Sequence, residues 1–452
     1  MLKKRLYLKI SPFFFCFVLI GTIFSPWEIF AEDIKKDTGS VHIVSPGESL
    51  NRIAHRYFPY AGTMTIGELI REIKEINGIS GSLIHPKQRL LIPMVRSTPI
   101  VAKTVPKPMD FEARGIYVNR YSMGSRKMRR LVDEVINSGC NTVILDAKDM
   151  SGQLSYPSRV NLAGEIGSNR SPVISNVSKM IHHLHEKGLH VVVRQVLFFD
   201  PILAAQRPDL ALHSKTTGKP LTERGKIGWV DPKKPAVQKY NLDVAKELAG
   251  LGVDEIQFDY IRYPTSKNIR ETGAGPGQTE ITRHEVITDF LARARRELAP
   301  FKVLLSIDVF GIVGWGRSED LQMTGQKLED LAKYCDVVSP MIYPSHFFGP
   351  FQGIARPADQ PFELVSEGCR RFSNLLENSN VTIRPWIQAF PYGTSAFDKT
   401  YILEELRALA QSKSKGWLLW SAGNAYHVSW KALAQWNELE SDNDLILGQS
   451  IL

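Results

Sequence analysis

Short apolar runs rich in β-branched and aromatic residues alternate with longer amphipathic runs between residues 112 and 440. Runs of this length, bounded by turn residues, are typical of β-strands. Eight of them fit: 115–121, 142–149, 190–198, 255–263, 303–310, 337–343, 382–390 and 416–421.

The longer runs between these strands have the spacing of surface helices. They cover residues 127–138, 237–251, 285–298, 364–376 and 402–410. Alternation of strands and helices predicts a parallel sheet of the α/β class, and eight repeats predict a closed (β/α)₈ TIM barrel. An open, doubly wound sheet is the alternative, although no GxGxxG follows the first strand.

The segments outside residues 112–440 do not show this alternation of strands and helices. Residues 1–31 combine a basic start, an apolar run and Ala31, which is the layout of a secretory signal peptide; an uncleaved signal anchor is the alternative. Residues 41–94 form a small unit of their own. The prolines within residues 95–111 predict an extended linker, and residues 441–452 remain as a C-terminal tail.

The net charge and the missing motifs argue against some classes of partner and cofactor. The net charge of +9 includes four basic residues and one acidic residue within residues 1–31. A basic exported protein suits anionic envelope polymers, although solubility explains the charge equally well. No basic stripe is interleaved with aromatic residues, so no nucleic-acid partner is expected. The sequence shows no CxxC, HExxH or GxSxG motif, and we expect no metal and no cofactor.

Carboxylates at the ends of two neighbouring strands are the candidate catalytic groups. Active sites of such barrels lie at the C-terminal ends of the strands. Strand alternation turns Gln257 and Asp259 toward the barrel axis, and on the next strand it turns Ser306 and Asp308 the same way. Two inward carboxylates on adjacent strands are what glycoside hydrolysis requires. A salt bridge between Asp259 and Arg262 is the structural alternative.

Further side chains at the strand ends are expected to bind substrate. Asp146 and Lys148 share the inward face of the second strand, where they either pair with each other or hold sugar hydroxyls. Only one of Arg194 and Gln195 can point inward. Aromatic rings at the rim suit stacking on pyranose rings, with core packing as the alternative. The candidate set is Asp146, Lys148, Asp149, Arg194, Gln257, Arg262, Tyr343, Trp386, Gln388 and Trp420.

The small unit opens with PGESL at 46–50 and closes with IHPKQRLLIP at 84–93. These motifs resemble the LysM domain, which implies a β-α-α-β topology and binding of N-acetylglucosamine-containing glycans such as peptidoglycan or chitin. A groove between the start of the first helix and the loop before the last strand would hold acetamido groups through backbone hydrogen bonds. The residues expected there are Gly47, Glu48, Ser49, Leu50, Ile84, His85 and Pro86.

The barrel carries FEARGIYV at 111–118, LDAKD at 145–149 and a matching stretch over residues 229–264. These segments resemble a TIM-barrel family of glycosyl hydrolases that was first catalogued as a domain of unknown function. The family is distantly similar to the α-amylase and α-galactosidase superfamilies, and the resemblance implies that Asp259 is the nucleophile. The acid/base residue of those superfamilies has no matching residue at its position in this chain. The fifth strand carries Asp308, and the sixth strand carries Ser339 and Tyr343.

We therefore predict an exported glycoside hydrolase of the cell envelope, periplasm or extracellular space, with a polysaccharide substrate. Asp259 is the expected nucleophile and Asp308 the expected acid/base of a retaining double displacement. Contact with a membrane is expected only through an uncleaved signal anchor. A non-catalytic carbohydrate-binding scaffold is the alternative, which a salt-bridged and occluded Asp259 would favour. A metal-dependent deacetylase or amidase is a weaker third interpretation.

Overall fold

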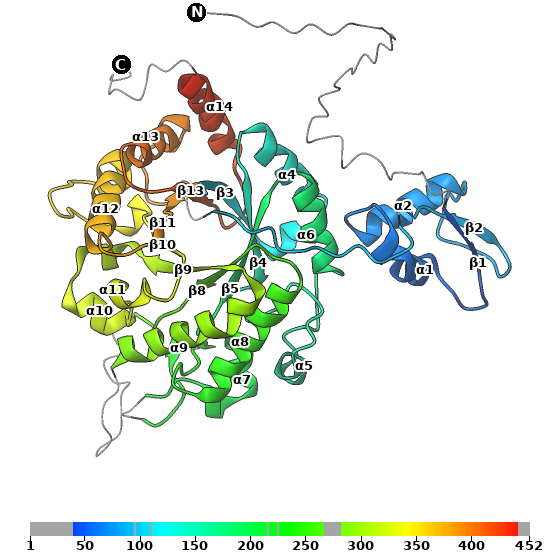
Figure 1. Cartoon of the computed structure of the whole chain (residues 1–452), viewed down its shortest axis with the longest axis horizontal. Coiled ribbons are helices and arrows are strands. Elements are labelled where there is room, and N and C mark those ends of the chain that lie inside the picture. Colours follow the sequence, from blue (N-terminus) through cyan, green and yellow to red (C-terminus); the bar gives the residue numbers. More distant parts are fainter. Residues whose placement is uncertain are drawn as a thin grey trace, which may run out of the picture.

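The computed structural model describes residues 39–94, 96–108, 111–214, 217–223, 226–265 and 282–441. A small module lies beside a large barrel (Figure 1). The predicted signal peptide, residues 1–31, lies outside the described residues, as does the tail beyond residue 441. Within the described ranges, no helix combines the length and the apolar character that a membrane span requires.

The small module has the β-α-α-β order implied by the LysM resemblance. Its outer strands pair antiparallel, Ser40 opposite Ile92, and its two helices pack together over one apolar core. Thr65 and Glu68 form a capping box that fixes the start of the second helix. The elements are β1 (Ser40–Ile43), α1 (Leu50–Tyr57), α2 (Ile66–Ile76) and β2 (Arg89–Ile92).

Eight parallel strands close into the predicted barrel. Its last strand pairs with its first, Leu418 opposite Gly115, which completes the ring. The seventh strand is interrupted at Pro385, and both of its halves pair with β10. The strands are β3 (Ala113–Val118), β4 (Thr142–Lys148), β5 (His190–Val196), β8 (Glu255–Asp259), β9 (Leu304–Phe310), β10 (Val337–Met341), β11 (Thr382–Ile383) with β12 (Trp386–Gln388), and β13 (Gly416–Trp420).

Helices cover the outside of this barrel, including all five that the sequence predicts (Figure 1). The principal ones are α4 (Lys127–Asn137), α6 (Val177–Glu186), α8 (Pro235–Gly250), α9 (Arg283–Leu298), α12 (Pro361–Leu375), α13 (Lys399–Ala410) and α14 (His427–Ser441). Shorter elements are α3 (Arg120–Met123), α5 (Asn161–Ile166), α7 (Pro201–Gln206), α10 (Ser318–Thr324), α11 (Leu328–Leu331) and the hairpin of β6 (Thr222–Glu223) and β7 (Lys226–Ile227).

The barrel has two apolar layers, one on each face of its sheet. Ile256 and Phe258 belong to the outer layer between strands and helices, and the ring of Phe258 lies 5.9 Å from that of Phe290 on α9. The inner layer fills the barrel itself and consists of Tyr117, Ile144, Val192, Tyr343, Trp386 and Leu418. The alternation expected for β8 is therefore confirmed, and its odd-numbered residues face the axis.

A buried ion cluster closes the N-terminal end of the barrel. The Glu255 carboxylate accepts hydrogen bonds from Arg384 Nη1 at 2.9 and 3.0 Å, and it lies 3.0 Å from His190 Nε2. All three side chains are buried. Burial raises the pKa of Glu255, but the charge of Arg384 and the contact with His190 outweigh that effect and lower the pKa to about 2.

Residues 96–108 contain no helix or strand and run along the barrel. The Ala102 amide donates to Ser178 Oγ at 2.7 Å, and the Val105 amide donates to Asp254 Oδ1 at 2.7 Å. This connection is extended, but it is hydrogen-bonded to the barrel and is not a free tether.

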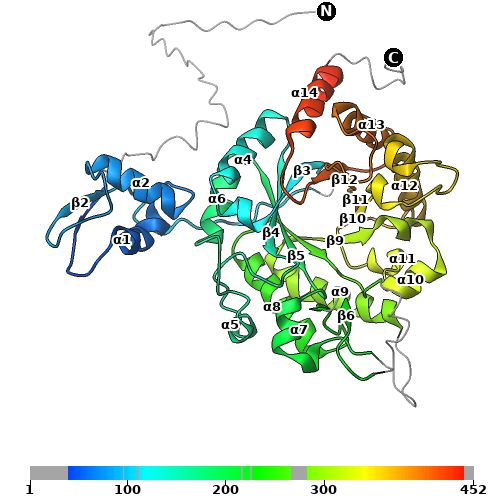
Figure 2. The same cartoon turned by 180° about the vertical axis from the view of Figure 1, so that it is seen from behind.

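The module also contacts the barrel directly, beside α4 and α6 (Figure 2). Lys179 Nζ on α6 donates to the Phe58 carbonyl at 2.5 Å and lies 3.5 Å from the centre of the Phe58 ring. On α4, Arg129 pairs with Glu68 at 3.0 Å. These contacts fix the module against one side of the barrel.

We expect Glu255→Gln to lower the free energy of unfolding by about 3–5 kcal/mol at pH 7, because it leaves Arg384 buried without a counter-charge. The folded-state pKa of about 2 lies below the ordinary value, so Glu255 stabilises the fold above pH ~4.5, and this stabilisation is lost as the pH falls toward 2. The difference between variant and wild type should therefore shrink in acid. Urea denaturation at several pH values measures it, and an equal difference at pH 7 and pH 3 would contradict the assignment.

Candidate active site

Asp259 and Asp308 end neighbouring strands at the same level of the barrel. The register places Gln257 of β8 opposite Ser306 of β9 and Phe258 opposite Ile307, so the two aspartates follow side by side on the inner face. Adjacent strands lie about 4.8 Å apart. Asp259 is 5% exposed and Asp308 is 2% exposed, so both carboxylates lie deep in the mouth.

Arg194 on β5 holds two carboxylates with one guanidinium group. Its Nε and Nη2 donate to Asp259 Oδ2 at 3.0 and 2.6 Å, and its Nη1 donates to Asp146 Oδ1 at 2.6 Å. The Tyr260 amide donates to the other oxygen of Asp259 at 2.6 Å. Charge-assisted hydrogen bonds of this kind fix the orientation of the Asp259 carboxyl group.

The partner of Asp259 is thus Arg194, and the expected alternative, a salt bridge to Arg262, is wrong. The Arg262 guanidinium donates to the Tyr263 carbonyl at 3.0 Å and lies 4.1 Å from the centre of the Phe310 ring. Tyr260 has a φ of 52°, so the chain leaves the strand geometry directly after Asp259.

Asp308 is in the opposite electrostatic environment. Burial raises its pKa well above the ordinary value, and the negative charge of Asp259 raises it further. The indole Nε1 of Trp386 donates to Asp308 Oδ1 at 2.7 Å and lowers this pKa in part. The mouth therefore places a carboxyl group that is bound by a guanidinium beside a neighbouring carboxyl group whose pKa is raised.

Lys148 does not share the inward face with Asp146, contrary to the sequence-based expectation. The register between β4 and β5 shifts between Asp146 and Lys148, and this irregularity turns the lysine outward. Its Nζ lies 2.6 Å from Asp200 Oδ2 and donates to Asn241 Oδ1 at 3.1 Å. Lys148 is fully buried, so its prediction as a substrate ligand is wrong and its role is structural.

Of the two residues that end β5, Arg194 points inward and Gln195 outward. The Gln195 amide nitrogen donates to the Asn241 carbonyl at 2.9 Å, on the helix side of the sheet. The guanidinium group of Arg194 is therefore the one that reaches the barrel mouth.

Three other candidates form hydrogen bonds to neighbouring protein groups around the mouth. Asp149 Oδ1 accepts from the amides of Ser151 and Gln153 at 2.8 and 3.1 Å. Gln257 is buried and contacts Ser339 Oγ at 3.4 Å. Gln388 is also buried, and its side chain ties together the loops that follow β10 and β12.

The aromatic candidates differ in exposure. Trp420 is half-buried, stacked on Tyr117 with ring centres 4.1 Å apart, and covered by the Arg194 guanidinium at 5.1 Å. Trp386 and Tyr343 are buried in the inner layer. Burial and the charge of Asp308 raise the pKa of Tyr343 well above its ordinary value. Trp420 alone of these three predicted aromatic residues presents part of its surface to the mouth.

Tyr117 is a site residue that the sequence reasoning missed. Its hydroxyl donates to Asp146 Oδ2 at 2.7 Å, which completes the chain from Tyr117 through Asp146 and Arg194 to Asp259. Strand alternation from Gly115 would have placed it on the inner face.

In the small module, the two predicted segments lie near the same end of the two-stranded sheet. The Lys87 amide donates to the Val44 carbonyl at 2.8 Å, which brings the loop before β2 against the end of β1. The Glu48 carboxylate is occupied by His42 at 2.8 Å and Arg56 at 2.9 Å, and Leu50 lies in the core. These two residues could therefore meet a glycan only through their backbone.

Within the described residues, no group of three or more His, Cys, Asp and Glu side chains is placed to hold a metal ion.

A family described as "Putative glycosyl hydrolase domain" matches residues 115–426. The LysM domain matches residues 42–93 and also 419–452, where the described part is the end of β13 and α14 of the barrel. No curated protein matches the chain.

Solved structures resemble the chain in part. A hypothetical protein from Ruminiclostridium thermocellum ATCC 27405 is 34% identical over 43% of this chain and 97% of that chain, with a TM-score of 0.39. The β-galactosidase of the psychrophilic Marinomonas ef1 is 10% identical over 74% and 62%, with a TM-score of 0.51, which shows a shared fold alone. The spore cortex-lytic enzyme SleL of Bacillus cereus is 12% identical over 88% and 86%, with a TM-score of 0.40.

We expect Arg194→Met to lower the free energy of unfolding by about 3–5 kcal/mol at neutral pH, because Asp146 and Asp259 would then be buried without a cation. Arg207→Met is the matched control: Arg207 pairs with Asp209 at 2.7 Å on the surface, where an exposed pair contributes little to stability. Thermal or urea unfolding compares the two variants. Equal losses of unfolding free energy in the two variants would show that the buried ion pairs of Arg194 do not stabilise the barrel mouth.

Proposed function

The chain belongs to the glycosyl hydrolase family that matches residues 115–426, and on that premise we propose that its barrel cleaves O-glycosidic bonds of a cell-envelope or extracellular polysaccharide. The observation that carries the proposal is the pair of inward carboxyl groups in opposite environments. Asp259 is bound by a guanidinium group, and Asp308 is buried beside it. Environments that separate the protonation states of two neighbouring carboxyl groups indicate an acid and a nucleophile.

In the proposed retaining mechanism, an Asp259 oxygen attacks the anomeric carbon while the bond to the leaving oxygen breaks. Asp308 donates its proton to that oxygen. In the second step Asp308 removes a proton from water, the water oxygen attacks the anomeric carbon, and the bond to Asp259 breaks. Carboxyl groups about 5 Å apart support retention, and side-by-side positions on adjacent strands agree with that separation.

Arg194 would position Asp259 in this reaction. Its two hydrogen bonds to Oδ2 and the Tyr260 amide at the other oxygen fix the orientation of the carboxylate. The same contacts stabilise the charge that reappears on Asp259 when the covalent intermediate is hydrolysed.

A non-catalytic carbohydrate-binding protein is the second candidate function. The salt bridge to Arg194 and the low exposure of both aspartates favour it. However, a purely binding mouth gains nothing from a protonated carboxyl group placed against an ionised one. Hydrolysis requires that combination, and we therefore prefer it.

The LysM module and the glycosyl hydrolase domain together suggest an extracellular or envelope protein. We propose that the module anchors the enzyme to a glycan that contains N-acetylglucosamine, such as peptidoglycan or chitin. Export through the signal peptide predicted in residues 1–31 is part of the same proposal.

The direct test is release of reducing ends from purified peptidoglycan, chitin, α-glucan and β-glucan. We expect Asp259→Asn to lower the release by at least ~10³-fold, because the nucleophile is lost. Asp209→Asn, at an exposed carboxylate, is the control that should keep full activity. Equal activity in wild type and Asp259→Asn would show that the active site lies elsewhere. Absence of release with glycan binding intact would favour the binding protein.

The proton donor can be tested through its pKa. Trp386→Phe removes the hydrogen bond that lowers the pKa of Asp308, so this pKa should rise. A general acid with a higher pKa keeps its proton to higher pH, and the alkaline limb of the pH profile of kcat/KM should move upward. Trp420→Phe changes a neighbouring ring and serves as the control. An unmoved or lowered limb in Trp386→Phe would exclude Asp308 as the acid.

A further inference from the structure

Exposed large hydrophobic side chains of the described part of the barrel gather at its C-terminal end. Tyr121 is 73% exposed, Phe348 is 77% exposed and Tyr392 is 59% exposed. They follow β3, β10 and β12, and Met150, 44% exposed, follows β4. Ile136, 39% exposed, is the exception at the other end, in the last turn of α4. Exposed apolar groups that cluster in this way mark a binding surface.

The order of the strands sets these side chains on two sides of the mouth. Around the ring, β3 and β4 are followed by β5, β8, β9, β10, β12 and β13. Tyr121 and Met150 therefore form one group on the rim and Phe348 and Tyr392 another, with β13 alone between the groups on the shorter arc. The strands of Asp259 and Asp308, β8 and β9, occupy the longer arc between these two groups.

Tyr121 is held in place by the residue before it. The Arg120 guanidinium lies 5.4 Å from the centre of the Tyr121 ring and donates to the Ser171 carbonyl at 2.7 Å. Its Nε also lies 3.4 Å from Asp149 Oδ2, so the ring is backed by a fixed cation. Such a ring offers one face to a ligand at low entropic cost.

The opposite side of the mouth is anchored in the same manner. Phe347 is buried, with its ring 5.1 Å from those of Trp315 and Phe351, and this contact turns the next residue, Phe348, outward. The Tyr392 carbonyl accepts from Gln388 Nε2 at 3.3 Å. These contacts therefore hold in place the loops that carry Phe348 and Tyr392.

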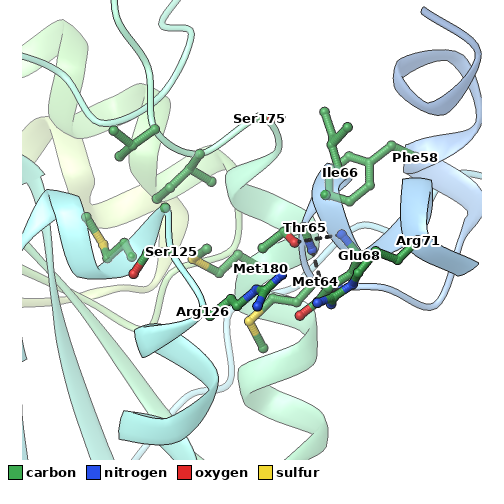
Figure 3. A pocket seen from close by; sticks show the side chains of 15 residues that line it. Phe58, Met64, Thr65, Ile66, Glu68, Arg71, Ser125, Arg126, Ser175 and Met180 are labelled. Atoms are coloured by element: carbon green, nitrogen blue, oxygen red, sulfur yellow. Dashed lines mark hydrogen bonds between the residues drawn. The ribbon is translucent and has the colours of Figure 1, made fainter. Parts of the chain in front are cut away.

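A groove between the two modules lies next to the loop that follows α3. It encloses about 430 Å³. On the barrel side it is lined by Ser125 and Arg126, which follow Tyr121 in the chain, and on the LysM side by Thr65 and Arg71 (Figure 3). A polymer that reaches this groove would contact both modules.

We propose that the barrel binds an extended polysaccharide chain across its mouth, with Tyr121 on one side and Phe348 and Tyr392 on the other as platforms for sugar rings. Aromatic faces pack well against the apolar faces of pyranose rings. Platforms on both sides of the two aspartates hold the chain on both sides of the bond to be cleaved. Cleavage then occurs within the polymer and not at its end. The nature of the ligand rests on the proposed function, but occupation of the platforms can be tested without turnover.

Hydroxyl-radical footprinting of full-length Asp259→Asn protein measures that occupation. The probes are chitohexaose, cellohexaose, maltohexaose and soluble peptidoglycan glycan strands, each compared with its disaccharide. We expect one of the longer probes to protect Tyr121, Phe348 and Tyr392 together, and its disaccharide to protect at most one side. Protection of LysM residues with unchanged oxidation of all three rings would overturn the proposal. Protection of the rings without hydrolysis by the wild type would refute the proposed function but would still support the binding of sugar rings at the three platforms.

Single alanine variants separate the platforms from general effects on folding. The ligand concentration that half-protects Trp420 reports binding at the mouth independently of the LysM module. We expect it to rise about 3- to 10-fold in Tyr121→Ala, Phe348→Ala and Tyr392→Ala, the loss of one stacking contact. Ile136→Ala, the exposed apolar residue at the opposite end, should leave it unchanged. Unchanged half-protection in all three ring variants would overturn the proposal.

Discussion

The architecture of the mouth depends on one buried guanidinium group. Arg194 cannot lose its charge and is 1% exposed, so the fold must surround it with carboxylates. Closure of the barrel supplies them, because β4 brings Asp146 and β8 brings Asp259 to either side of β5. Both acids are then committed to Arg194. Asp308, one strand further, lies deep in the mouth, where burial and the negative charge of Asp259 raise its pKa.

Charged groups are therefore paired differently at the two ends of the barrel. At the N-terminal end the Glu255 carboxylate is bound by both Arg384 and His190, which suits a structural role. An apolar layer separates this cluster from the mouth. At the mouth the pairing is incomplete, because a single cation is hydrogen-bonded to two acids while the third, Asp308, has a raised pKa. Incomplete pairing costs stability, and such a cost is expected where a protein performs chemistry.

Much of the fold could be predicted because its signals are local. All eight strands follow from short apolar runs and five helices from amphipathic spacing, and alternation along each strand predicted that Asp259 and Asp308 face inward. Signals that depend on contacts distant in sequence were missed. The irregularity that turns Lys148 outward arises from pairing with β5, and the choice of Arg194 over Arg262 depends on the strand order around the ring. Tyr260, with its positive φ, ends β8 four residues before the apolar run does.

In the proposed mechanism Asp308 carries a proton while Asp259, its neighbour, does not. Difference infrared spectroscopy at pH 6, between wild type and each Asp→Asn variant, measures this directly through the carbonyl stretch of protonated carboxyl groups. Other buried acids such as Glu405 are common to every sample and cancel in the difference. Loss of a protonated carboxyl band in Asp308→Asn, with only a carboxylate band lost in Asp259→Asn, is the expected result. Loss of the protonated band in Asp259→Asn, or in neither variant, would contradict the assignment of acid and nucleophile.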